Sequence, residues 1–251
     1  MARGHSPHGG GAQSGVVEGV SLAPYLSVVV PFYNERDNVE PLHAELLGAL
    51  AVVSGGFELL YVDDGSRDGT REVIAKLAAQ DARVHALHFG ENAGQTAALD
   101  AGFRAARGEV IATLDGDGQN DPADLPRLLA ALASADVVNG VRTNRQDAWL
   151  RKLSSRVANA FRNWATGENV TDVGCSLRVM RASYLKRVKL WRGMHRFLPT
   201  LLRLEGARVI ELPVSHRPRL AGVSKYGIGN RLFVGLADLM AVRWMIKRQL
   251  K

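Results

Sequence analysis

Val110-Ile-Ala-Thr-Leu114, followed by Asp115-Gly-Asp117-Gly-Gln119-Asn-Asp121-Pro122, is the most informative stretch of this chain. The apolar, β-branched run predicts a buried strand, and the Asp/Gly-rich segment predicts the loop that follows it. Side chains two residues apart in extended backbone point to the same side, so Asp115 and Asp117 converge. Such carboxylates suit Mg²⁺ or Mn²⁺, which also bind substrate phosphates. Taken alone, the segment also fits a plain turn.

Two other predicted strands end in polar loops. Phe57 to Val62 runs into Asp63-Asp64-Gly65-Ser66-Arg67-Asp68-Gly69-Thr70, and Leu26 to Val30 runs into Pro31-Phe-Tyr33-Asn-Glu35. Strands of this kind, alternating with helices, predict an open α/β sheet with its ligand beyond the carboxyl ends of the strands. The glycine motifs of dinucleotide dehydrogenases and P-loop NTPases are absent from the sequence. A diphosphate would therefore be neutralised by a metal ion.

One α/β domain over residues 23–231 is expected, with a single open, mostly parallel twisted sheet flanked by helices. Residues 1–22 are expected to form a disordered tail, since residues 1–16 are rich in Gly, Ser and His. Strands are predicted near 26–31, 57–62, 83–88, 110–114, 136–140, 175–180 and 207–214. Helices are predicted near 37–51, 70–79, 95–106, 123–133, 149–165 and 232–246.

Charge is divided very unevenly along the 251 residues. Residues 1–141 carry a net charge of −10 and residues 142–251 a net charge of +17, which together give +7. An acidic first half suits a cation-dependent site, and a basic second half suits anions such as a phosphorylated acceptor or anionic lipid. The sequence contains no nucleic-acid recognition module, so nucleic acid is not an expected partner. The single cysteine, Cys175, excludes an intramolecular disulfide and is expected to be buried.

Several motifs in the first half resemble those of one enzyme family. They are V-V-P-F-Y-N-E (29–35), V-D-D-G-S-x-D-G-T (62–70), N-x-G-Q-x-A-A-L (92–99) and D-G-D-G-Q-N-D-P (115–122). Together they look like the inverting family 2 glycosyltransferases of GT-A fold. The resemblance implies a nucleotide-sugar half at 23–141 and an acceptor half at 142–231.

Motifs in the second half narrow the resemblance. They are Asn139-Gly-Val-Arg142, Arg151-Lys-x-x-Ser-Ser155, Asp172-x-x-Cys-Ser-Leu-Arg178, Arg217-Pro-Arg219 and Gly222-Val-Ser224-Lys225-Tyr226-Gly227. They are similar to those of the polyprenyl-phosphate sugar synthases, the group that contains dolichol-phosphate mannose synthase. The match covers roughly residues 26 to 231. One departure is Cys175-Ser-Leu-Arg178, where the family has Ser-Gly-Phe-Arg, so roles in that segment are not assigned.

The resemblance implies a role for each matching residue. The residues matched to the base and ribose are Pro31, Tyr33, Glu35, Val62 and Asp64. The metal is matched to Asp115, Asp117 and Gln119, and the diphosphate loop consists of these three residues and Gly116. The residues matched to the phosphates of donor and acceptor are Arg142, Arg151, Ser155, Arg196, Arg219 and Lys225. Among these, Asp117, Arg142 and Lys225 are the candidate catalytic residues. Simpler readings stay open: Pro31 ends a strand, Glu35 caps the next helix, Asp64 forms a turn, and Arg196 is a surface arginine.

The implied reaction is metal-dependent, inverting transfer from a GDP- or UDP-linked sugar to a polyprenyl phosphate. The product would be a lipid-linked sugar for glycan or lipid modification of the cell envelope. One alternative is a family 2 transferase that acts on a sugar or polysaccharide hydroxyl, although Met240 stands where the processive Q-x-x-R-W motif has Gln. The other is an inactive lipid- or nucleotide-binding subunit, against which the intact Asp115, Asp117 and Gln119 argue.

The last predicted helix is too short and too charged to span a bilayer, which needs about 20 apolar residues. Leu232, Leu236, Leu239, Val242 and Ile246 follow helical spacing and precede the basic Lys247, Arg248 and Lys251. The helix either packs on the domain or lies in the membrane interface. We therefore expect a cytoplasmic protein, peripheral to the inner face of the membrane, that reaches its lipid directly or through a membrane partner subunit or homo-oligomer.

Overall fold

A computed structural model describes residues 23–143, 162–164, 166–167, 170–172, 174–218 and 231–249. In this part of the chain the strands are β1 Leu26–Phe32, β2 Phe57–Asp63, β3 Val84–His88, β4 Val110–Thr113, β5 Val137–Arg142, β6 Arg178–Arg181 and β7 Val209–Val214. The helices are α1 Arg36–Leu50, α2 Thr70–Gln80, α3 Gln95–Ala105, η1 Pro122–Asp124, α4 Leu125–Ala131, α6 Ala182–Leu185, η2 Met194–Phe197, α7 Leu198–Leu204 and α8 Arg231–Arg248.

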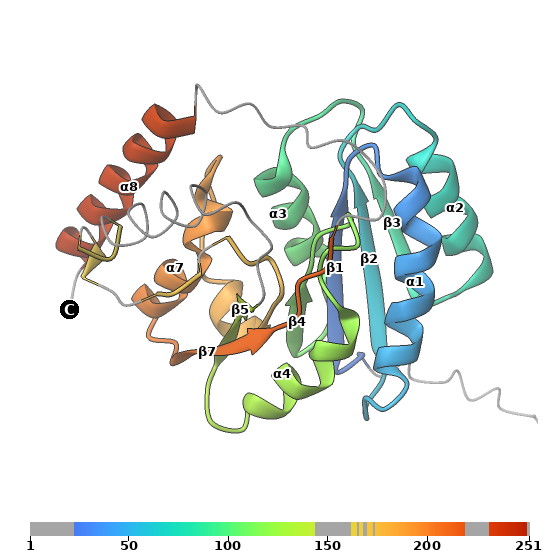
Figure 1. The fold of residues 1–251 in the computed structure, drawn as a ribbon, viewed down its shortest axis with the longest axis horizontal. Coiled ribbons are helices and arrows are strands. Elements are labelled where there is room, and N and C mark those ends of the chain that lie inside the picture. The colour runs from blue at the N-terminus through green and yellow to red at the C-terminus, as the bar shows by residue number, and fades with distance from the viewer. Residues whose placement is uncertain are drawn as a thin grey trace, which may run out of the picture.

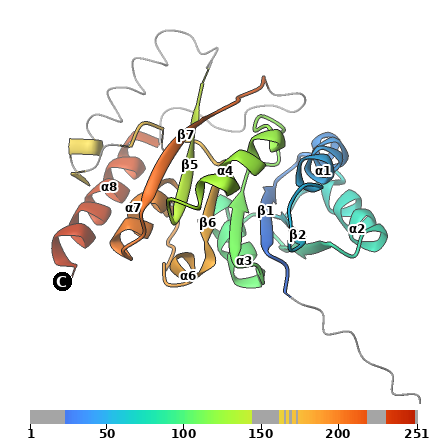
Figure 2. The ribbon, with the colours of Figure 1, turned by 90° about the horizontal axis from the view of Figure 1, so that it is seen from below.

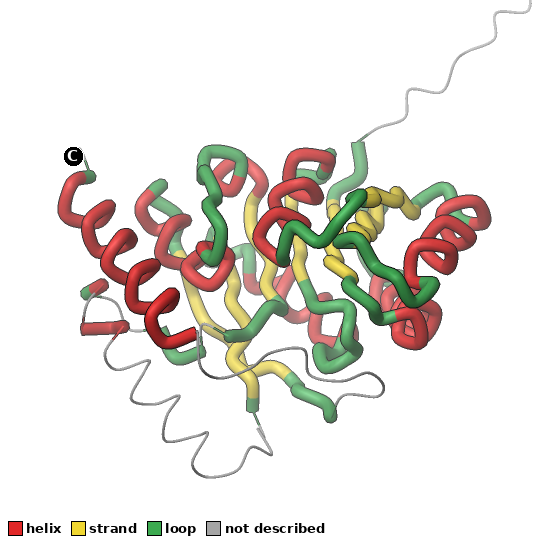
Figure 3. Tube along the Cα trace, turned by 90° about the horizontal axis from the view of Figure 1, so that it is seen from above, coloured by secondary structure: helices red, strands yellow, loops and turns green. Residues whose placement is uncertain are grey.

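The strands form one sheet in the order β3-β2-β1-β4-β6-β5-β7. Neighbours pair in parallel except β6, which runs antiparallel to both β4 and β5. Figures 1 and 3 show this sheet with helices packed along it. The prediction of a single, mostly parallel α/β sheet is therefore confirmed.

Both faces of the sheet are covered, which explains why its strands are apolar along their whole length. Val28 and Val30 of β1 point into one core, beneath α1, α2 and α4. Val29 points into the opposite core, with side chains of α3, α6 and α7. Figure 2 shows the two groups of helices on opposite sides of the strands. Because β1 pairs in parallel with both β2 and β4, the carboxyl ends of these three strands lie together at one edge of the sheet.

The structure differs from the predicted elements in three places. The helix expected at 123–133 begins as η1, where the Asp121 carboxylate accepts the N–H of Ala123, and continues as the shorter α4. β6 and β7 begin at Arg178 and Val209, later than predicted. The short helices α6, η2 and α7 were not predicted, because their few turns leave little periodicity to detect. Most of the helix predicted at 149–165 and the tail at 1–22 lie outside the described residues.

The C-terminal helix α8 packs on η2 and α7 (Figure 1). Leu239 and Val242 are buried there, which agrees with the first of the two alternatives, a helix packed on the domain. Leu236 was expected on the same face but is 46% exposed, and with Met240 and Trp244 it forms an exposed apolar stripe at four-residue spacing. None of the described helices is long and apolar enough to cross a membrane.

Candidate functional site

A cavity of about 310 Å³ lies beyond the carboxyl ends of the strands. The loops after β1, β2, β3 and β4 all contribute to it. Its lining residues are Pro31, Phe32, Tyr33, Glu35, Asp64, Asn92, Gly94, Gln95, Asp115, Gly116 and Asp117. The structure thus brings together seven of the residues predicted from sequence: Pro31, Tyr33, Glu35, Asp64, Asp115, Gly116 and Asp117.

The loop after β1 is held in place by the loop after β2. Thr70 Oγ1 accepts the N–H of Glu35 at 3.0 Å, and the Asp68 carboxylate accepts the N–H of Arg36 at 3.2 Å. The Glu35 carboxylate is buried and accepts the side-chain amide of Asn38 at 2.7 Å. Glu35 is also the N-cap residue of α1, without a side-chain bond to the helix backbone. It therefore occupies the helix start and the cavity wall at once.

Asp64 organises the loop before α3. Its carboxylate accepts N–H groups from Asn92, Ala93 and Gly94, at distances from 2.7 to 3.2 Å. Gly65 permits the approach of this loop, since a Cβ there would lie 2.4 Å from the carbonyl carbon of Glu91. Burial raises the pKa of Asp64, although these hydrogen bonds act to lower it. Asp64 thus lines the cavity and also builds one of its walls.

Asp115 and Asp117 stand on either side of Gly116 at the end of β4. A Cβ on Gly116 would lie 2.4 Å from the Phe32 ring, so only glycine fits the backbone here. Asp115 Oδ1 accepts the side-chain amide of Gln95 at 2.8 Å. Gln95 is the first residue of α3, so that helix orients the carboxylate.

Burial, and then the charge of Asp117, raises the pKa of Asp115 to about 6. The pair is an accumulation of negative charge that a divalent cation would relieve. Among the described residues, His, Cys, Asp and Glu nowhere form a group of three or more that could hold a metal. Mg²⁺ and Mn²⁺ fit this pair, because they accept one or two carboxylates and complete their shell with phosphate and water.

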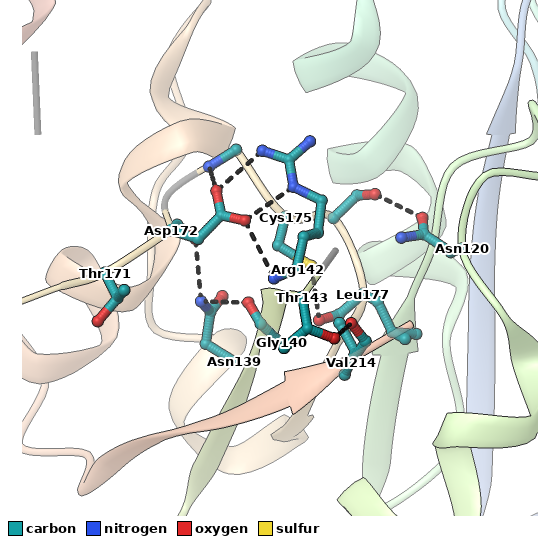
Figure 4. Close-up of polar contacts among 12 residues, drawn as sticks. Asn120, Asn139, Gly140, Arg142, Thr143, Thr171, Asp172, Cys175, Leu177 and Val214 are labelled. Carbon is teal, nitrogen blue, oxygen red and sulfur yellow. Dashed lines mark hydrogen bonds and ion pairs between the residues drawn. The ribbon is translucent and has the colours of Figure 1, made fainter. Parts of the chain in front are cut away.

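Arg142 lies at the end of β5 and is bound by a carboxylate from another segment (Figure 4). Its Nε and Nη2 donate to Asp172 at 2.7 and 2.9 Å. Asn139 Nδ2 donates to the Asp172 carbonyl, and Gly174 N–H donates to its carboxylate. The pKa of Arg142 is raised by this pairing, although burial opposes it. The cation predicted for a substrate phosphate is therefore engaged by Asp172.

The other predicted residues that the structure describes are not among those that line this cavity. Val62 is fully buried, with its side chain in the core beneath α3. Gln119 Nε2 donates to the carbonyl oxygen of Arg217 at 3.4 Å. Arg196 lines a neighbouring cavity. Arg151, Ser155, Arg219 and Lys225 lie outside the described residues.

Residues at or beside the site that were missed from the sequence lie after β3, in the first turn of α3, in β6 and in η2. Asn92 and Gln95 belong to the N-x-G-Q motif, and the rule that ligands bind at the carboxyl ends of strands would have found them had it been applied to β3. His195 Nδ1 lies 2.7 Å from Thr96 Oγ1, which also accepts the N–H of Gly193. The buried Arg178 donates to the carbonyls of Cys175 and His195. No short motif signals these contacts, which join residues up to 99 positions apart.

His195 makes stability depend on pH. Burial, and then the charges of Arg196 and Arg178, lowers its pKa to about 3 from 6.5. Between these values the unfolded chain binds the proton more tightly, so the free energy of unfolding should fall as pH decreases from 6.5, by up to ~1.4 kcal/mol per pH unit. Urea unfolding at a series of pH values from 4.5 to 7.5 would measure this dependence. We expect the free energy of unfolding to change less steeply with pH for His195→Gln than for the wild type. Equal slopes for both proteins would contradict this assignment.

A family model described as "Glycosyl transferase family 2" matches residues 27–189. Among curated proteins, the dodecaprenyl-phosphate galacturonate synthase of Rhizobium johnstonii is 41% identical over 228 residues, 88% of this chain and 67% of that protein. The undecaprenyl-phosphate 4-deoxy-4-formamido-L-arabinose transferase of Edwardsiella ictaluri is 38% identical over 206 residues, 81% of this chain and 63% of that protein. The chain thus spans about two thirds of the length of these relatives.

Solved structures share the fold. A mannosyltransferase from Pyrobaculum calidifontis, in complex with GDP-Man and Mn²⁺, matches with a TM-score of 0.59 at 20% identity, over 88% of this chain and 62% of that one. Glucosyl-3-phosphoglycerate synthase from Mycobacterium tuberculosis, with Mn²⁺, UDP and its product, matches with a TM-score of 0.61 at 19% identity, over 89% and 77%. At these identities the likeness concerns the fold alone.

Proposed function

The chain belongs to glycosyl transferase family 2, and from this we propose that it transfers a sugar from a nucleoside-diphosphate sugar to a polyprenyl phosphate. The observation that carries the proposal is the cavity in which Asp115 and Asp117 face the loops after β1, β2 and β3. The first curated relatives support the acceptor, since their names specify dodecaprenyl or undecaprenyl phosphate. These names specify different sugars, so membership of the family leaves the sugar undecided.

The donor nucleotide would occupy this cavity, with its base and ribose against Pro31, Tyr33, Glu35 and Asp64. A bound Mg²⁺ or Mn²⁺ on Asp115 and Asp117 would supply charge stabilisation for the departing diphosphate. The solved mannosyltransferase and glucosyl-3-phosphoglycerate synthase that share the fold contain Mn²⁺ with GDP-Man and with UDP, respectively.

The residues of this chain would contribute mainly orientation. Gln95 holds the Asp115 carboxylate through its side-chain amide, and Asp64 holds the loop that carries Gln95. The acceptor needs no general base, because the second pKa of a phosphate monoester is ~6 and its oxygen is already a nucleophile at neutral pH. A single displacement at the anomeric carbon, with inversion, would then complete the transfer.

The acceptor phosphate is assigned to the basic second half. Arg151, Ser155, Arg219 and Lys225 would bind it, and all four lie outside the described residues. Arginine suits such contacts because its planar guanidinium binds two phosphate oxygens at once. Arg142 would act near the same phosphates while Asp172 holds it in place.

The enzyme would act at the inner face of the membrane. Leu236, Met240 and Trp244 form the exposed stripe on α8, and Lys247 and Arg248 lie in its last turn. Apolar side chains beside basic ones suit the interface of an anionic bilayer. The opposite face of α8 packs on the domain, so the two readings of this helix are compatible.

Release of nucleoside diphosphate tests the proposal. We expect UDP or GDP to be released from one nucleotide sugar of a panel only when Mn²⁺ or Mg²⁺ and undecaprenyl or dolichyl phosphate are both present. A prenyl alcohol of the same length is the matched control, since it lacks the phosphate. Release with sugar hydroxyl acceptors but not with prenyl phosphate would contradict the acceptor assignment. Nucleotide binding without release under any condition would favour an inactive subunit.

A further inference from the structure

A second cavity, of about 530 Å³, adjoins the nucleotide cavity. Asn92, Gly94 and Gln95 line both cavities, so they form a common wall. The far side of the second cavity is formed by residues 190–193 and 195–196, before and within η2. Its volume lies within the range of about 300–1,000 Å³ that is typical of small-molecule sites. A donor bound beside Asp115 can therefore extend past Gln95 into this space.

Two arginines line the second cavity, and a carboxylate outside its lining, that of Asp238, packs against Gly193 in its wall. The arginines are Arg192 and Arg196, and within the described part of the chain neither guanidinium makes an ion pair or hydrogen bond. Asp100 is the carboxylate in the lining, and it is paired with Arg104 at 2.8 Å. His195 stays neutral, because its pKa is lowered to about 3. The cavity therefore favours a ligand group that is negatively charged.

Trp191 adds an apolar surface beside these arginines. It lines the same cavity with 45% of its surface exposed, and the Lys189 ammonium lies 5.6 Å from its ring centroid. An aromatic ring gives the C–H face of a sugar a large apolar contact, while neighbouring polar groups fix its orientation. Asn92 supplies such a group from the common wall, and Thr96 supplies another from the lining of the second cavity.

We propose that the second cavity binds the sugar of the donor and selects a sugar that carries a carboxylate, through Arg192 and Arg196. This inference rests on the proposed function, whose nucleotide cavity shares the Asn92–Gln95 wall. The diphosphate is matched to the metal pair, so it does not need these arginines. The acceptor phosphate is assigned to Arg151, Ser155, Arg219 and Lys225. Arg196, which the resemblance matched to the same phosphates, lines the second cavity instead. A carboxylate fits the planar fork of arginine with two parallel hydrogen bonds.

Binding of matched nucleotide sugars tests the inference. Calorimetry in Mn²⁺ would compare UDP-galacturonate with UDP-galactose, UDP-glucuronate with UDP-glucose, and GDP-mannuronate with GDP-mannose. Each pair differs only by the carboxylate in place of a hydroxymethyl group. We expect at least one uronate to bind about tenfold or more tightly than its neutral partner, as a charge-assisted contact predicts. Arg192→Gln and Arg196→Gln should each reduce this preference, and the double variant should abolish it.

Lys186→Gln is the matched control, because it removes the same charge from an exposed residue outside the cavity. It should keep the preference, and UDP alone should bind Arg192→Gln as tightly as the wild type. If nucleotides bind but every pair binds equally, or if the preference survives the double variant, this inference fails while the proposed function stands. If the arginine variants weaken binding of a short-chain prenyl phosphate instead, the cavity belongs to the acceptor and the inference is overturned. If no nucleotide binds at all, the proposed function fails, and this inference with it.

Discussion

Asp115→Asn and Asp117→Asn are each expected to lower turnover at least ~10³-fold, since a metal ion at a departing diphosphate is worth several kcal/mol and each 1.36 kcal/mol is tenfold. Asn retains the shape of Asp, and at position 115 it still offers an oxygen to Gln95. The fold should survive, and the free energy of unfolding at pH 7 should be unchanged or higher. The reason is that burial and Asp117 raise the pKa of Asp115 to about 6, so its charge opposes folding above that pH.

Mn²⁺ binding measured by electron paramagnetic resonance separates a lost metal from a lost fold. Both variants should bind Mn²⁺ with UDP or GDP much more weakly than the wild type. Asp37→Asn is the control, because Asp37 is an exposed carboxylate in the first turn of α1. If either active-site variant in excess EDTA turned over substrate as fast as the wild type does with Mn²⁺, the metal assignment would be wrong.

Glu58→Ala is expected to lower the free energy of unfolding by ~1–3 kcal/mol, because it removes the acceptor of the buried Ser27 hydroxyl and of two donors of Arg107. Glu58 lies in β2 opposite Ser27, at the end of the sheet away from the cavity. Its carboxylate accepts Ser27 Oγ at 2.6 Å and the N–H and Nε of Arg107, each at 2.8 Å. Urea unfolding at pH 7 would measure the loss. At a temperature where the variant stays folded, its turnover should match the wild type.

The pH dependence of the same site adds a check. Burial raises the pKa of Glu58, but the hydrogen bonds from Ser27 and Arg107 outweigh it and leave the pKa below 4.5. The stabilisation is therefore present above pH 4.5 and lost as pH falls through the lower, folded-state pKa, so wild type and Glu58→Ala should converge in acid. Glu109→Ala, at an exposed carboxylate, should change stability by less than ~0.5 kcal/mol. A similar loss of stability in Glu58→Ala and Glu109→Ala would show that the hydrogen bonds of Glu58 do not account for the effect.

Much of the fold could be predicted from the sequence, because apolar strands alternate with helices of clear periodicity. The strand ends at Pro31, Asp64 and Asp115 had to meet, since the carboxyl ends of parallel strands share one edge of a sheet. The GT-A fold and the family follow from the same motifs and are confirmed. Short helices such as α6 and α7 escaped, because four to seven residues do not establish a period.

Side-chain partnerships were decided only by the tertiary structure. The side chain of Val62 lies in the core, as the alternation of its strand requires, although its motif predicted contact with the nucleotide. Arg142 meets Asp172 from a segment 30 residues away, and Gln95 reaches Asp115 across 20 residues. Local sequence determines which residues stand at a strand end. Which of them line the cavity, and which are bound by other parts of the chain, depends on packing between distant segments that no local pattern encodes.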